Sequence, residues 1–142
     1  MGYTYYKLMA LIPKDAEITF DDIYARLQRK FAKIEEARIE RPETNHIQLR
    51  FNDWLYHIHL EDKPSAIELI EILETFATKR PDWDVIASSD QRMTTYGMSD
   101  PDMDHFNDHV FVMEVLESLP ELYLYDPNDG KLWKSGENPF AN

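Results

Sequence analysis

The chain has no cysteine and only four glycines among its 142 residues. The first absence excludes disulfides and thiolate metal sites and fits a reducing compartment, so we expect a cytoplasmic protein. Four scattered glycines exclude a glycine-rich phosphate loop, and Ser88 and Ser89 lack the G-x-S-x-G context of a serine hydrolase. No stretch approaches the roughly 20 apolar residues of a membrane span. The N-terminal apolar run is broken by Pro13, which predicts a strand rather than a signal peptide.

Basic side chains are scarce relative to acidic ones. The chain has 15 Lys and Arg against 27 Asp and Glu, which gives a net charge of −12. Residues 1–60 hold nine of each sign, whereas residues 61–142 hold six basic and eighteen acidic side chains. This field disfavours nucleic acid and anionic membranes, and we expect neither as a partner. It suits a basic protein partner or a cation, or it only provides solubility.

The chain is rich in the residues that build a core. Hydrophobic residues make up 43% and aromatic residues 13%, enough for one packed domain. Connections between the expected elements are mostly short, which favours antiparallel strands. We therefore expect a single α+β domain over residues 1–136, a mostly antiparallel sheet with about three helices packed on one face, and a frayed tail at 137–142. The expected strands cover 3–12, 35–41, 46–51, 54–60, 82–89, 92–96 and a closing pair within 121–133, and the expected helices cover about 19–31, 64–80 and 101–119.

The runs "HIQLRF" and "WLYHIHL" predict a β-hairpin, because only Asn52 and Asp53 separate them. A two-residue turn pairs Phe51 with Trp54 and continues in steps of one residue along both strands. We expect the preceding strand to match Ile39 with Ile47. The hairpin register brings three histidines together on the polar face, as an open zinc or other divalent metal site would require; the alternative is an ordinary solvated face. These candidate metal ligands are His46, His57 and His59.

The stretch "SDPDMDHFNDHVF", residues 99–111, combines aspartate and histidine. It begins like a D-x-D-x-D calcium loop, but His105 stands where the loop needs glycine and Phe111 where it needs glutamate. Capping by Ser99 with Asp102, or by Asp100 with Pro101, together with the helix dipole, explains three of the four aspartates as the start of a helix near Pro101.

His105 and His109 form H-x-x-D-H with Asp108, one methylene shorter than a zinc-protease pattern. A helical wheel places both histidines on the apolar side of the helix. They are either a pair of zinc ligands or core histidines bonded to internal partners.

We expect a binding protein rather than an enzyme, and we assign no catalytic residue and no cofactor. The leading hypothesis is an acidic module that captures a basic protein, with a composition similar to adaptor or immunity-type inhibitor proteins. One alternative is a metal-binding protein or metal-dependent hydrolase that uses the histidines and a divalent metal such as zinc. Another is a homo-oligomeric structural protein. The candidate partner-binding residues are Asp100, Asp102, Asp104, Glu114, Glu117 and Asp126.

Overall fold

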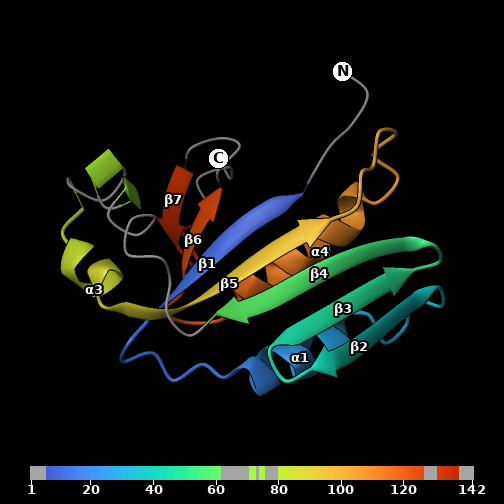
Figure 1. Cartoon of the computed structure of the whole chain (residues 1–142), viewed down its shortest axis with the longest axis horizontal. Helices are drawn as coiled ribbons and strands as arrows, with labels where there is room; N and C mark the ends of the chain where they lie inside the picture. The colour runs from blue at the N-terminus through green and yellow to red at the C-terminus, as the bar shows by residue number, and fades with distance from the viewer. Residues whose placement is uncertain (1–5, 62–70, 73, 76–79, 127–130, 138–142) are drawn as a thin grey trace.

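The strands form one seven-stranded antiparallel sheet in the order β2-β3-β4-β5-β1-β6-β7. The computed structural model describes residues 6–61, 71–72, 74–75, 80–126 and 131–137. Figure 1 shows the sheet with α1 and α4 behind it. This arrangement confirms the predicted α+β class with a mostly antiparallel sheet. The described elements are β1 (Lys7–Pro13), α1 (Phe20–Lys30), β2 (Ala37–Glu43), β3 (His46–Phe51), β4 (Trp54–Glu61), α3 (Trp83–Ala87), β5 (Ser89–Gly97), α4 (Phe106–Glu117), β6 (Tyr123–Asp126) and β7 (Lys131–Lys134).

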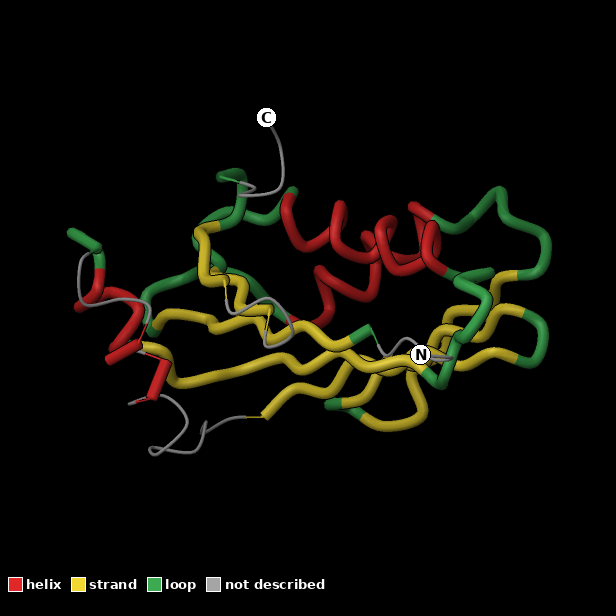
Figure 2. The backbone as a smooth tube through the Cα atoms, turned by 90° about the horizontal axis from the view of Figure 1, so that it is seen from above, coloured by secondary structure: helices red, strands yellow, loops and turns green. Residues whose placement is uncertain are grey.

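The main core lies between one face of the sheet, called here the inner face, and the helices α1 and α4 (Figure 2). Side chains alternate along each strand, so every second residue points into this layer. Ile23 and Leu27 of α1 and Val112 and Leu116 of α4 are fully buried against it. Burial of apolar surface at about 25 cal/mol per Å² is the main stabilising contribution of this layer.

The opposite, outer face is covered differently along its length. Near β1 and β6, Leu11 and Tyr123 pack with Ile72 and with Ile86 of α3 in a second apolar cluster. Hence two of the three described helices cover the inner face, and α3 packs from the other side. Over β3 and β4 the outer side chains other than Leu55 are polar and at least partly exposed, and Figure 1 shows no described element in front of these two strands.

The β3–β4 hairpin has the register that the sequence predicts. Phe51 pairs with Trp54 and His46 with His59. Asn52 takes a positive φ of 57°, a conformation that asparagine tolerates better than most residues. The register between β2 and β3 differs, because Ile39 pairs with Leu49 and not with Ile47. A shift of two residues keeps Ile39 on the inner face, so the apolar pattern alone does not distinguish the two registers.

The prediction for the first helix is confirmed at its start. The Thr19 hydroxyl accepts from the amide of Asp22 at 3.1 Å, and the Asp22 carboxylate accepts from the amide of Thr19 at 3.3 Å. This reciprocal capping box satisfies two amides that helix geometry otherwise leaves unpaired.

The prediction of a strand over residues 82–89 is wrong for most of its length, because residues 83–87 form α3. Asp82 is anchored by Arg80 and accepts from the Tyr123 hydroxyl at 2.8 Å. Only Ile86 of α3 is buried, and it meets Leu11 and Tyr123. These tertiary contacts outweigh the weak strand preference of a short apolar run.

Two further predictions fall largely outside the described residues. Of the helix expected at about 64–80, five residues are described, and all of them except Arg80 are helical: Glu71, Ile72, Glu74, Thr75 and Arg80. Of the tail expected at 137–142, only Glu137 is described, and it accepts a hydrogen bond from Arg80 at 3.0 Å. Among the described residues no helix is both long and apolar enough to cross a membrane.

We expect Gly97→Ala to lower the free energy of unfolding by about 1–3 kcal/mol. A Cβ atom at Gly97 would lie 2.7 Å from the ring of Trp54 and 3.1 Å from that of Tyr56, so the packed indole must move. Urea unfolding of the variant measures the change. Gly136→Ala is not a suitable control, because Gly136 has a φ of 91°, a conformation that is strained for any residue with a side chain. Ala87→Gly on the short helix α3 is the comparison at a peripheral site. Equal or smaller loss at Gly97 would contradict the close packing.

Candidate metal centre

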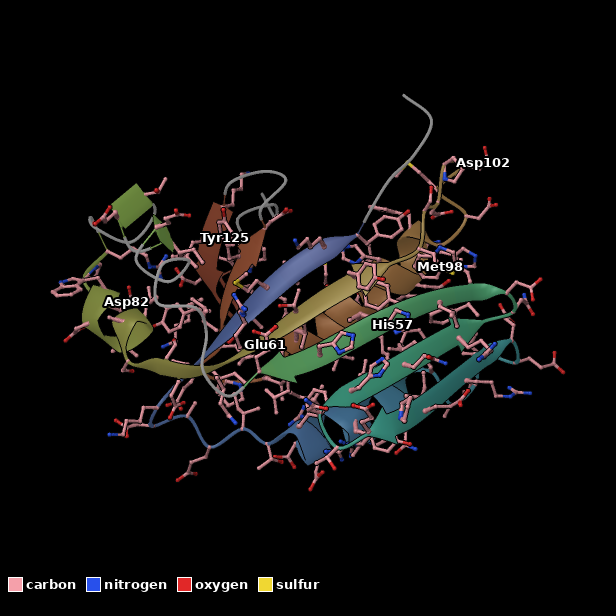
Figure 3. The ribbon with its side chains drawn as sticks, in the orientation of Figure 1. His57, Glu61, Asp82, Met98, Asp102 and Tyr125 are labelled. Atoms are coloured by element: carbon pink, nitrogen blue, oxygen red, sulfur yellow. The ribbon has the colours of Figure 1, made fainter. Side chains whose placement is uncertain are left out.

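Three histidines converge on the outer face of β3 and β4. The H-x-H spacing on β4 places His57 and His59 on the same face, and the register sets His46 directly opposite His59. The rings of His46 and His59 stack with centroids 4.2 Å apart. Figure 3 shows His57 projecting from β4 on the side away from α1 and α4. One potential ligand atom from each ring lies within 4.8 Å of the others.

The nitrogen positions are close to those that a metal ion needs. The Nε2 atom of His46 and the Nδ1 atom of His57 are 2.9 Å apart and share a hydrogen bond. Two imidazole nitrogens bound to one zinc ion at about 2.1 Å lie roughly 3.4 Å apart. Small side-chain rotations would bring the three nitrogens, which lie within 4.8 Å of one another, to the spacing of a zinc site. The outer face leaves the fourth position open to water or to another ligand.

The electrostatics of the cluster favour the neutral histidines that bind metals. Burial lowers the pKa of His46, and the charge of His59 lowers it further while Glu43 opposes the shift. Burial also lowers the pKa of His57, followed by the charges of His46 and His59. A neutral imidazole carries the free lone pair that coordination requires, so fewer protons must leave when a metal binds.

The strands on either side add polar and aromatic groups. Glu43 of β2 pairs in register with His46. On the other side, Tyr96 of β5 stacks on His57 with ring centroids 5.5 Å apart. Glu61, two residues beyond His59, forms an ion pair with Arg92. The site is therefore a partly exposed patch of sheet with acidic groups nearby, suited to holding a cation at the surface.

His105 lies on the other side of the sheet, where it is partly exposed and packs against Trp54 at the margin of the core. Its ring stacks on Trp54 at 4.4 Å with an interplanar angle of 6°. Its Nδ1 atom lies 3.0 Å from a carboxylate oxygen of Asp108, and burial raises the pKa of that carboxyl group. The Nδ1 atom of His105 thus has a partner within the protein, Asp108, three residues along the chain.

His109 is also held by internal contacts. Its Nδ1 atom shares a hydrogen bond of 2.8 Å with the hydroxyl of Tyr56, and its ring stacks on Tyr6 at 4.8 Å. Burial lowers the pKa of His109 to about 4. The prediction that both histidines face the apolar side is confirmed for His109 by this packing. Within the described residues, the one converging group of three metal-ligating side chains includes neither His105 nor His109.

Asp100, which the sequence places on a partner-binding surface, is buried instead, with 4% of its surface exposed. Its carboxylate accepts from the hydroxyl of Tyr6 at 2.6 Å and from the amides of Asp104 and His105 at 3.0 and 2.9 Å. These bonds hold residues 100–105 in turns, and α4 begins only at Phe106. The expected helix start near Pro101 is therefore wrong, because the Asp100 side chain binds the amides outside any helix.

The remaining candidate partner-binding residues are spread over several elements. Asp102 and Asp104 are exposed in the loop before α4. Glu114 forms an ion pair with Lys30 at 2.6 Å, and Glu117 accepts from the indole of Trp133 and the amide of Gly136. Asp126 is the last residue of β6. The structure thus leaves Asp102 and Asp104 as neighbouring carboxylates that point outward from one loop.

The sequence revealed the histidine cluster because alternation and a two-residue turn specify it. The buried Asp100 network was missed because Tyr6 and Asp100 are 94 residues apart along the chain. Tyr96 was missed because its contact with His57 depends on the β4–β5 register. Comparison of the chain with protein-family models, with curated proteins and with solved structures gave no match.

Proposed function

We propose that this protein binds a divalent transition-metal ion through His46, His57 and His59. The observation that carries the proposal is the convergence of three ring nitrogens within 4.8 Å on a partly exposed sheet face. The lowered pKa values of His46 and His57 support it, because burial shifts both rings toward the neutral form that coordinates a metal.

The ligand set indicates which ions suit the site. Three imidazoles favour zinc, copper, nickel or cobalt over magnesium and calcium, which prefer oxygen ligands. Zinc commonly completes four-coordination with water when the protein supplies three ligands. The protein thus holds the ion with three ligands and leaves one coordination position for an exchangeable ligand. A structural site, in contrast, fills all four positions with protein ligands.

The test is calorimetric titration of zinc and nickel into protein purified without a metal-affinity step. We expect one ion per chain at pH 7.5. His57→Ala is expected to weaken binding by about 100-fold or more, since even loss of a group that only orients a ligand costs about 10–100-fold. Gln48→Ala is the matched control, because Gln48 pairs with His57 on the same face but is not one of the three converging ligands. Binding that is absent, or equal in the two variants, would refute the proposal.

The pH dependence of binding provides an independent check. Protons compete with the metal for each imidazole, so the affinity is expected to fall as the pH is lowered from 7.5 to 5. A site built from surface carboxylates would retain more of its affinity over this range, because carboxyl groups titrate near pH 4. Binding that stays constant to pH 5 would therefore contradict coordination by histidine.

A further inference from the structure

Exposed apolar side chains are concentrated in the segment of the chain that leads from β5 into α4. Of the six large apolar side chains that are exposed in the described part of the chain, four fall within residues 96–106. Figure 3 shows Met98 and Asp102 at this end of the molecule. Large apolar side chains that stay in water, grouped in one place, mark an interaction surface more often than scattered single ones do. The four are Tyr96, Met98, Met103 and Phe106, with exposed fractions of 50%, 46%, 49% and 41%.

This segment, called here the 96–106 surface, is held in place by hydrogen bonds to β4. The amide of Met98 donates to the carbonyl of Leu55 at 3.0 Å, and the indole of Trp54 donates to the carbonyl of Met98 at 3.2 Å. The buried carboxylate of Asp100 binds the turns that follow. A surface that is already ordered loses less conformational entropy when a partner binds.

Met103 stands at the outer turn of the segment. Its amide donates to the carbonyl of Asp100 at 3.0 Å, and its φ of 58° lies in the left-handed region that most side chains avoid. Met98 and Met103 have flexible, unbranched side chains, and methionine adapts well to irregular apolar partners. The backbone therefore presents an adaptable apolar group on a rigid support.

Charge identifies the kind of partner that fits. Asp102 and Asp104 are exposed on either side of Met103, and the net charge of the chain is −12. The same field repels a second copy of the chain and an anionic membrane, whereas it attracts basic side chains. An apolar centre with charged groups at its rim is the usual composition of a protein–protein interface.

We propose that the 96–106 surface docks a basic, amphipathic segment of another protein. Apolar side chains of that segment cover Met98, Met103 and Phe106, while its Lys or Arg side chains pair with Asp102 and Asp104. The docking does not depend on the proposed metal function, because none of these five residues is a metal ligand. The proposal gives Asp102 and Asp104, two of the acidic residues in the second half of the chain, a role in binding the partner.

The experiment measures binding of a fluorescent 16-residue Leu/Lys peptide with one apolar helical face. Two matched peptides serve as controls: one with the same composition in scrambled order and one with Glu in place of Lys. We expect the amphipathic basic peptide to bind at least about 10-fold more tightly than either control, and more weakly as salt is raised. Equal binding of the scrambled peptide, or no binding of the basic peptide, would overturn the proposal.

Variants locate the contact. Met103→Ser combined with Phe106→Ser is expected to weaken binding by about 10-fold or more, as loss of central apolar contacts does. Trp83→Ser combined with Val85→Ser is the matched control, since both are exposed apolar residues of α3. Asp102→Asn with Asp104→Asn is expected to weaken binding about 3- to 10-fold and to reduce its salt dependence. An equal loss in the α3 variant would overturn the proposal.

Other occupants give different results. A second copy of the chain would give a dimer in sedimentation equilibrium that Met103→Ser with Phe106→Ser dissociates. A membrane would give cosedimentation with phosphatidylserine vesicles that the same variant abolishes. Either result overturns docking of a basic protein segment.

Discussion

Replacement of Asp100 by asparagine is expected to lower the free energy of unfolding by about 3 kcal/mol. The buried carboxylate accepts three hydrogen bonds, from Tyr6, Asp104 and His105. Asparagine keeps the shape of the side chain but has one accepting oxygen, and its NH₂ group would face a backbone N–H. A buried donor left without an acceptor costs about 1–3 kcal/mol, and bonds to a charged acceptor are among the stronger ones.

Two further variants separate the buried network from general charge effects. Asp102→Asn also removes one negative charge, but at an exposed position two residues further along the chain. We expect it to change the free energy of unfolding by less than about 0.5 kcal/mol. Tyr6→Phe removes one of the three donors, with an expected loss of about 1–2 kcal/mol. Urea unfolding at pH 7.5 measures all three. Equal effects of Asp100→Asn and Asp102→Asn would show that the buried bonds do not carry the stability.

The same network connects the core to both proposed surfaces. Tyr6 bonds to Asp100 beneath the 96–106 surface and stacks on His109, which bonds to Tyr56 of β4. On the opposite face of that strand, His57 belongs to the candidate metal centre. Rigid support from the core keeps each group of surface side chains in place, which is what a preorganised site requires. Loss of Asp100 should therefore loosen the docking segment more than the histidine cluster, since the latter is held by strand pairing.

The histidine cluster was predictable because its determinants are local. Strict alternation assigns every side chain of β3 and β4 to one face, and a loop of two residues leaves one register. A shift of one residue would expose Ile47, Leu49 and Phe51, all of which are buried. The free-energy cost of exposing these three side chains fixes the register of the hairpin, and the register determines which residues lie opposite and beside His46.

The segment that carries the docking surface, residues 96–106, was harder to predict. The local sequence resembles a helix start at Ser99, Asp100 and Pro101. A capping interaction there needs only neighbouring residues and no side chain from a distant part of the chain. In the structure Tyr6, the residue before β1, binds Asp100, so the carboxylate is satisfied inside the protein and the helix begins at Phe106. The error at α3 has the same origin, since Asp82 is fixed by Tyr123 from a distant strand. Long-range polar contacts of this kind leave no periodic signal in the sequence.

Acid is expected to destabilise the protein through His109 in the range between pH 6.5 and 4. Burial lowers the pKa of His109 to about 4 from its ordinary value of 6.5. Between these values the unfolded chain binds a proton that the folded protein excludes, so stability rises with pH and is lost as the pH falls. From pH 7.5 to pH 5 the expected contribution of this one group is a loss of about 2 kcal/mol in the free energy of unfolding.

His109→Gln tests this contribution, because glutamine does not titrate and its amide can still bond to the hydroxyl of Tyr56. Wild type and variant are unfolded in urea at pH 7.5 and pH 5. His46 and His57 also have lowered pKa values, and the carboxyl pKa of Asp108 is raised, but these groups remain in both proteins and cancel in the comparison. The variant should therefore lose about 2 kcal/mol less than the wild type over this range. The same pH dependence in both proteins would contradict the lowered pKa of His109 and show that its burial against Tyr6 and Tyr56 does not exclude a proton at pH 5.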